Sequence, residues 1–248
     1  MTHPVLSGCE PFIFQGGPTG ILLIHGFTGS PVSLRDWGAD LAERGFAVDC
    51  PRLPGHGTAW EDLAGRTAAE WVREIDAALT RVADRSDRVV VAGLSFGGAL
   101  AIDLAARRGG EIAGLVLVNP YLRDRRHALL PVARRLLRSV PGTGNDIKKV
   151  GPDELSYTRI PLRALAQAGL LMKRARLALP SVRHPILVFH SATDHVIPAD
   201  NGPYVLRHAG SEDTELVTLS DSFHVATMDN DAPTIFERTA AFVERVTA

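Results

Sequence analysis

The stretch RVVVAGLSFGGALAIDLAAR, residues 88–107, decides the fold of this chain. Val89 to Ala92 is a short apolar run of the kind that forms a strand buried on both faces. From Ala99 onward the apolar residues take the spacing of a helix. Between the two lies a G-x-S-x-G pattern, residues 93–97, where a strand turns sharply into a helix. A glycine-rich turn can contain a serine by chance, but this context favours Ser95 as a nucleophile.

Strand-like and helix-like runs alternate on both sides of this stretch. The predicted strands are Pro11–Gln15, Ile21–Ile24, Phe46–Cys50, Val89–Ala92, Leu115–Val118, Ile186–His190 and Thr214–Leu219. Helices are predicted at Arg35–Arg44, at Thr67–Ala83 with a Thr67–Glu70 capping box, and at Pro233–Val246. The short connections predict an α/β fold with a doubly wound, mostly parallel sheet.

The alternation stops after residue 120. Residues 121–183 contain no strand-like run and are expected to form two or three helices. We predict a small helical cap, residues 121–183, inserted after the sixth core strand and lying across the carboxyl edge of the sheet, with residues 1–120 and 184–248 as the core. Its helical stretches are an apolar stripe between residues 129 and 140, and Pro161–Leu179.

The charge of the chain is unevenly distributed. The net charge is −1, which argues against a nucleic-acid partner. Residues 123–183, however, hold 14 Lys and Arg against 4 Asp and Glu, a net charge of +10. These side chains either cover the wet faces of cap helices or attract an anionic lipid surface or an acidic substrate.

The remaining composition indicates a cytoplasmic enzyme. No apolar run of about 18 residues or more is present to span a membrane, and Met1 to Pro4 lack the basic start of a secretory signal. Cys9 and Cys50 have no spacing motif and are expected to be free thiols in a reducing compartment. No metal or nucleotide motif is evident, so we expect no metal and no cofactor.

Two loops beyond Ser95 carry partners for a nucleophile. A serine hydroxyl needs a base within hydrogen-bond reach, itself oriented by a third group. Asp194 follows the predicted strand 186–190, and His224 follows the strand 214–219. The carboxyl ends of parallel strands share one rim, and the chain order Ser, Asp, His is the one expected for α/β-hydrolases. We predict Ser95 as nucleophile, His224 as base and then acid, and Asp194 as the group that orients the imidazole.

Other histidines and carboxylates compete for these roles. His25 and His56 lie in glycine-rich loops and are interpreted as loop-bracing residues. His190 and His195 flank Asp194 on its own loop, whereas the base should come from a different strand. The alternative acids are Asp200, Asp221 and Asp229.

An oxyanion hole needs two converging N–H groups. We predict the backbone N–H of Phe96, which follows the nucleophile, and that of Phe27, where Gly26 permits close approach. The two phenyl rings either pack in the core or line the pocket. The substrate is expected between the rim and the apolar faces of the cap, contacting Gly26, Phe27, Phe96, Leu137, Met172 and Val196.

These motifs together resemble a known family. Residues 22–31, 54–57, 93–98, 194–198 and 222–224 are similar to the motifs of small bacterial carboxylesterases and monoacylglycerol lipases of the α/β-hydrolase superfamily. The resemblance implies a cofactor-free serine hydrolase acting on esters of short to medium acyl chains, with Phe27 and Phe96 as the oxyanion donors. The family often has Ser-Gly-His or Gly-His before the base, whereas this chain has Ser222-Phe223-His224.

We therefore expect a serine carboxylesterase that hydrolyses short- to medium-chain esters through an acyl-enzyme on Ser95. A monoacylglycerol lipase, a thioesterase and a carbon–carbon hydrolase use the same triad, so they remain alternatives. The alternative outside the enzymes is a protein with a hydrolase fold that binds a ligand without catalysis. The expected partner is a small ester or monoacylglycerol. If the basic side chains of the cap attract anionic lipid, the cap is expected to contact a membrane surface weakly. The chain is expected to be a monomer or homodimer.

Overall fold

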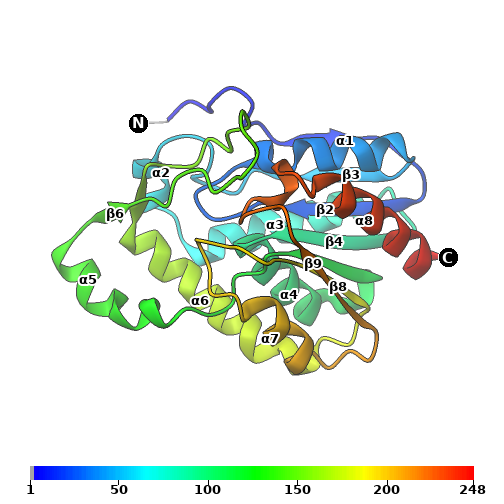
Figure 1. The fold of residues 1–248 in the computed structure, drawn as a ribbon. Coiled ribbons are helices and arrows are strands. Elements are labelled where there is room, and N and C mark those ends of the chain that lie inside the picture. The colour runs from blue at the N-terminus through cyan, green and yellow to red at the C-terminus, as the bar shows by residue number, and fades with distance from the viewer. Residues whose placement is uncertain (1–2) are drawn as a thin grey trace.

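A seven-stranded sheet runs through the centre of the computed structural model, which describes residues 3–248 apart from the side chain of His127 (Figure 1). Met1 and Thr2, part of the stretch considered for a secretory signal, lie outside the described residues. The sheet has the order β1-β3-β2-β4-β5-β8-β9. Only β1 is antiparallel to its neighbour, so the predicted mostly parallel sheet is confirmed. The strands are β1 (Phe12–Phe14), β2 (Thr19–Ile24), β3 (Ala47–Cys50), β4 (Arg88–Leu94), β5 (Gly114–Val118), β8 (Ile186–Ser191) and β9 (Thr214–Leu219).

Helices cover both faces of this sheet. One face packs against α1 (Arg35–Glu43) and α8 (Ala232–Thr247). The other packs against α3 (Ala68–Ala83), α4 (Phe96–Arg108) and α7 (Asn201–His208). Helix α6 (Leu162–Ala178) packs on α4, and the short helix α2 (Trp60–Ala64) precedes α3. Successive strand residues point to opposite faces, so β2 contributes Leu22 to one apolar layer and Leu23 to the other.

Helix α3 begins as its sequence predicts. Thr67 is the N-cap, and its hydroxyl accepts the N–H of Glu70 at 3.4 Å. The Glu70 carboxylate accepts the N–H of Thr67 at 2.8 Å, which completes the capping box. The confirmed cap gives α3 a defined start beneath β2 and β3.

The segment between β5 and β8 differs from its prediction in two ways. It contains two strands, β6 (Ser139–Pro141) and β7 (Arg159–Pro161), which pair antiparallel to each other. Each has three residues, too few for an alternating pattern to be recognised. The segment also follows β5, the fifth strand along the chain rather than the sixth, because only five strand-forming runs precede it.

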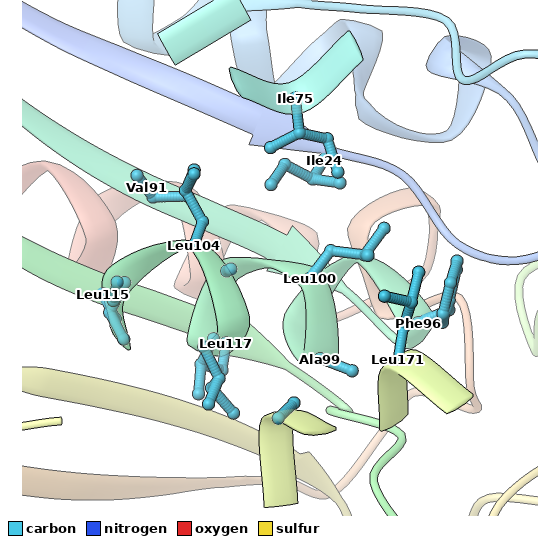
Figure 2. Close-up of a cluster of buried hydrophobic side chains, with 14 of the residues drawn as sticks. Ile24, Ile75, Val91, Phe96, Ala99, Leu100, Leu104, Leu115, Leu117 and Leu171 are labelled. Carbon is cyan, nitrogen blue, oxygen red and sulfur yellow. The ribbon is translucent and has the colours of Figure 1, made fainter. Parts of the chain in front are cut away.

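Helix α6 belongs to the packed interior. Figure 2 shows Leu171 of α6 in the same apolar cluster as Phe96 and Ala99 of α4. On α4 the buried Asp103 carboxylate also binds the guanidinium of Arg174, with one N–O distance of 2.6 Å, and that of Arg107 at 2.9 Å. Apolar contact and ion pairing together hold α6 on α4.

Helix α5 (Leu130–Leu136), by contrast, lies at one end of the molecule, away from the sheet (Figure 1). The expected apolar stripe is largely open to solvent, since Leu129 is 71%, Val132 61% and Leu136 79% exposed. The helical spacing of these residues predicts an apolar face, but it does not predict whether another element covers that face. Among residues 3–248, none of the helices has the length and apolar character needed to cross a membrane.

Candidate active site

The turn between β4 and α4 holds Ser95 in a strained conformation. Its φ is 55°, in the left-handed region that residues with a side chain rarely adopt. A Cβ at Gly97 would lie 2.0 Å from the carbonyl oxygen of Ile24, and one at Gly93 would lie 2.4 Å from Gly97 backbone atoms. The N–H of Ser95 donates to the carbonyl of Val118 at 2.9 Å. Glycines on both sides therefore let this turn fit against β2.

The structure brings Ser95, His224 and Asp194 together. The Ser95 Oγ lies 2.8 Å from Nε2 of His224, and Nδ1 of His224 lies 2.7 Å from Oδ2 of Asp194. A carboxylate only accepts hydrogen bonds, so Nδ1 carries the ring proton and Nε2 accepts from the serine hydroxyl. All three side chains are buried, with Ser95 and His224 each 6% exposed.

Electrostatic contacts favour the charged form of both partners of this pair. Burial lowers the pKa of His224, but the hydrogen bond and charge of Asp194, with the charges of Glu154 and Asp146, raise it above its ordinary value. Burial raises the pKa of Asp194, yet the His224 contact lowers it overall, together with the N–H groups of Val196 and Ile197 at 2.9 Å each. The arrangement can take a proton from Ser95 and stabilise the resulting imidazolium.

Asn119 binds the main chain of the loop that carries His224, the histidine loop. It follows β5 with a φ of 43° and is fully buried. Its Nδ2 donates to the carbonyl of His224 at 2.8 Å and to the Ser191 hydroxyl at 2.9 Å, while its Oδ1 accepts the N–H of Ser191 at 2.8 Å. The sequence analysis missed this residue. A polar side chain directly after a fully apolar strand was the available signal.

The competing histidines occupy other positions. In the loop after β2, Nε2 of His25 accepts the N–H of Leu53 at 3.1 Å, and its Nδ1 donates to the carbonyl of Gly26 at 2.9 Å. Burial lowers the pKa of His25 to about 4. His56 is also buried and lies 3.3 Å from the Pro54 carbonyl. His195 binds Asp146, and burial lowers the pKa of His190.

The competing carboxylates are likewise engaged elsewhere. Asp200 pairs with Arg123 at 2.8 Å, and Asp221 pairs with Lys148 at 2.5 Å. Asp229 accepts the N–H of Phe223 at 2.9 Å. Of the considered acids, Asp194 is the one that lies on the His224 ring.

The residues predicted for the oxyanion hole lie beside Ser95. Phe96 is the first residue of α4, and the first N–H groups of a helix have no partner within it. Gly26 and Phe27 line the same cavity as Ser95, and a Cβ on Gly26 would lie 3.5 Å from Cβ of Ser95. The phenyl rings of Phe27 and Phe96 pack edge to face, with centroids 5.7 Å apart. The Phe96 ring is fully buried in the core and does not line the cavity.

The cavity above Ser95 has a volume of about 370 Å³. Val196 lines it as predicted, but Leu137 and Met172 do not. Leu137 directly follows α5 and is 53% exposed, and Met172 lies on the face of α6 that packs into the core. The apolar lining comes instead from other residues of the insertion, namely Leu129, Leu130, Ala133, Val140, Ile160, Leu162 and Leu165.

Glu154 adds a polar group to this cavity that the sequence analysis missed. It lies between β6 and β7 and lines the cavity together with Ser95 and His224. Burial raises its pKa to about 7, although the charge of His224 and a hydrogen bond from Ser156 act in the opposite direction. No regular element contains Glu154, so no periodicity pointed to it.

Comparison with known proteins assigns the chain to a family. Residues 19–231 match the family described as serine aminopeptidase, S33. The chain belongs to the S33 family. A thermostable monoacylglycerol lipase from Bacillus sp. (strain H-257) is 37% identical over 97% of this chain and 96% of its own. A carboxylesterase from Bacillus subtilis (strain 168) is 24% identical over 96% of this chain and 97% of its own.

Solved structures share the fold of this chain. A structure from work on LipS and LipT, two metagenome-derived lipolytic enzymes, is 38% identical, covers 98% of this chain and 100% of its own, and has a TM-score of 0.94. The monoacylglycerol lipase of Paleococcus ferrophilus is 18% identical with a TM-score of 0.77, a likeness of fold. The predicted α/β-hydrolase fold and superfamily are therefore confirmed.

Proposed function

We propose that this S33 protein is a serine carboxylesterase that hydrolyses short- to medium-chain esters. The observation that carries the proposal is the chain of hydrogen bonds from Ser95 through His224 to Asp194, which opens into an apolar cavity. The similarity to a monoacylglycerol lipase and a carboxylesterase supports carboxylic esters as the substrate class.

The mechanism follows from the positions of these groups. The Ser95 Oγ attacks the ester carbonyl carbon while His224 Nε2 takes its proton. The carbonyl oxygen becomes an oxyanion, for which the N–H groups of Phe96 and Phe27 are the proposed donors. His224 then protonates the leaving alcohol, which leaves the acyl group on Ser95. A water molecule, deprotonated by His224, then attacks the acyl carbon. The bond from that carbon to Ser95 Oγ breaks, His224 returns the proton to Oγ, and the acid leaves.

Replacing Ser95 by alanine tests this proposal. The S95A variant should lose turnover of p-nitrophenyl butyrate by at least about 10⁴-fold, because no acyl-enzyme can form. It should also lose labelling by a fluorophosphonate probe. An unchanged circular dichroism spectrum and melting temperature would show that the fold is retained. Turnover by folded S95A at the wild-type rate would contradict the proposal. Turnover of thioesters and of diketones by the wild-type protein, compared with its turnover of esters, separates the esterase from a thioesterase and a carbon–carbon hydrolase.

Monoacylglycerol hydrolysis is a second candidate, favoured by Glu154. The acyl chain of an ester finds apolar side chains in the cavity, whereas a glycerol leaving group carries two hydroxyls that need acceptors. Glu154 offers a carboxyl group on the same cavity as Ser95 and His224. We infer that it accepts a hydroxyl of the leaving glycerol.

Substitution of Glu154 separates the two candidates. Glu154→Leu should lower the ratio of kcat/KM for monobutyrin over methyl butyrate by about tenfold or more, since an acceptor for a hydroxyl is lost. Glu154→Gln retains an amide oxygen and should lose less. Asp153→Asn changes the adjacent, exposed carboxylate and serves as the matched control. An unchanged ratio in Glu154→Leu would leave the simple esterase as the better description.

We also infer that α5 contacts an anionic lipid surface. Its exposed apolar side chains are accompanied by Arg134, Arg135 and Arg138, which are exposed as well. An apolar face flanked by basic side chains is typical of helices that lie in a membrane interface. The same helix supplies Leu130 and Ala133 to the cavity wall, so a docked lipid would lie near the site.

A further inference from the structure

Asp146 contacts both loops that carry the partners of Ser95. It lies between β6 and β7, and its side chain is 12% exposed. Its Oδ2 accepts the main-chain N–H of His224 at 3.1 Å and that of His195 at 3.2 Å. Its Oδ1 accepts from Nδ1 of His195 at 2.8 Å. Since His195 directly follows Asp194, one carboxylate joins the acid's loop to the base.

A second carboxylate holds the Asp146 loop against the histidine loop. Asp229, 1% exposed, accepts the N–H of Lys148 at 2.7 Å and that of Phe223 at 2.9 Å with the same oxygen. The N–H of Val225 donates to the main-chain carbonyl of Asp146 at 3.1 Å. The main-chain N–H groups of Phe223 and Val225, on either side of His224, are thus tied to the Asp146 loop. These contacts fix the position of Asp146 independently of its own bond to His224.

We propose that Asp146 is a positioning residue for hydrolysis, which holds the His224 main chain and the Asp194 loop in one frame. The inference rests on the proposed function, because it concerns the base of that reaction. Asn119 binds the carbonyl of His224 and Asp146 binds its N–H, so side chains from two other segments hold both main-chain groups of the base. A small displacement of the imidazole would lengthen its 2.8 Å contact with Ser95.

Asp146 also acts through its charge. Together with Asp194 and Glu154 it raises the pKa of His224. Removing this negative charge should therefore lower that pKa and move the acidic limb of the rate profile to lower pH. The charged and titratable groups around the two residues are Asp194 and His195 after β8, Asp229 after β9, Lys148, Asp153 and Glu154 on the Asp146 loop, and Arg126, which binds the Val196 carbonyl.

Three variants test the proposal. Asp146→Asn keeps the shape but has one acceptor oxygen in place of two, so an NH2 group faces either the two main-chain N–H groups or Nδ1 of His195. The kcat for p-nitrophenyl butyrate should therefore fall about tenfold to a hundredfold with KM within about threefold. The acidic limb of kcat/KM should also move to lower pH. Asp146→Glu keeps the charge, so its limb should remain closer to the wild-type position even where kcat falls. Asp153→Asn, which removes a carboxylate from the same loop, should change neither quantity.

Fluorophosphonate labelling between pH 5 and 9 gives a second readout that does not depend on the choice of ester. Wild-type protein that labels but turns over no ester would contradict the proposed function, while the labelling rates of the Asp146 variants would still test the positioning role. Asp146→Asn with a wild-type rate and an unchanged acidic limb would overturn the inference, as would wild-type protein that does not label. If Asp146→Asn does not fold, Asp146→Ser, which removes the charge and keeps one small acceptor, decides: a wild-type kcat and an unchanged acidic limb in that variant would also overturn it.

Discussion

The ring of His224 has a different partner at each nitrogen, and both contacts matter for its protonation. Asp194 receives the Nδ1 proton, and Ser95 donates to Nε2. Three carboxylates, those of Asp194, Glu154 and Asp146, raise the pKa of this ring against the effect of burial. The base must be neutral to accept the serine proton, so its pKa sets the lower pH limit of activity.

We therefore predict that activity falls on the acidic side with a midpoint above pH 6.5, the ordinary value for histidine. A raised pKa means that the protonated, inactive form persists to higher pH than in an isolated imidazole. The measurement is kcat/KM for p-nitrophenyl butyrate from pH 5 to 9 in buffers of constant ionic strength. A midpoint below 6.5 would contradict the assigned environment of His224.

Single residues were predictable where they end a strand of the sheet. Ser95, Asp194 and His224 each follow a parallel strand of the sheet, so topology and chain order indicated that they would meet. Glu154 and Asp146 lie in an irregular stretch between β6 and β7, where no periodicity relates sequence to position. Asp146 binds the histidine loop 78 residues further along the chain and the Asp194 loop 49 residues further, and both contacts depend on how the insertion folds back.

The helices α5 and α6 show what an amphipathic pattern can and cannot predict. Both segments have apolar residues at helical spacing and arginines between them. Helix α6 buries that face against α4, whereas α5 leaves Val132 and Leu136 open to solvent. Periodicity identifies an apolar face, but it does not say which neighbouring element, if any, covers that face.

The exposure of α5 predicts salt-sensitive binding to anionic lipid. Vesicles containing phosphatidylglycerol should sediment the protein at low ionic strength, and binding should weaken as salt screens the arginines. Replacing Val132 and Leu136 together by aspartate should abolish sedimentation, whereas turnover of a water-soluble ester should be retained because neither side chain lines the cavity. Val150→Asp, at a site 97% exposed outside α5, is the control. Equal sedimentation of all three proteins would contradict the prediction.

Acid affects the molecule through its buried histidines. His25 and His56 are fully buried beside one another, with ring centroids 5.1 Å apart, and burial lowers the pKa of both. Their contribution to stability is complete above the unfolded value of about 6.5 and is lost as pH falls below it. His224, whose pKa is raised, acts in the opposite direction: its contribution is present below about 6.5 and is lost above the raised value.

Glu154, whose pKa is raised to about 7, also gains stability on acidification and offsets His25, while the His224 contribution is already complete below pH 6.5. The remaining group is His56, so the free energy of unfolding should decrease between pH 6.5 and 4. His25 alone, with its pKa near 4, accounts for about 3 kcal/mol over that interval. Urea unfolding at pH 7.5, 6 and 5, followed by tryptophan fluorescence, measures the change. His56→Gln should flatten the dependence, at some cost in stability at neutral pH. A free energy of unfolding that is constant or rises toward pH 5 would contradict this assignment.

The edge position of β9 has a consequence for how the protein matures. The nucleophile and its base are 129 residues apart, and the base follows β9, which is the last strand along the chain and an edge strand of the sheet. During synthesis Ser95 leaves the ribosome well before any group that can activate it. A chain shortened before β9 lacks its base, so esterase activity during refolding should report the arrival of the carboxyl-terminal strand and not the earlier collapse of the core.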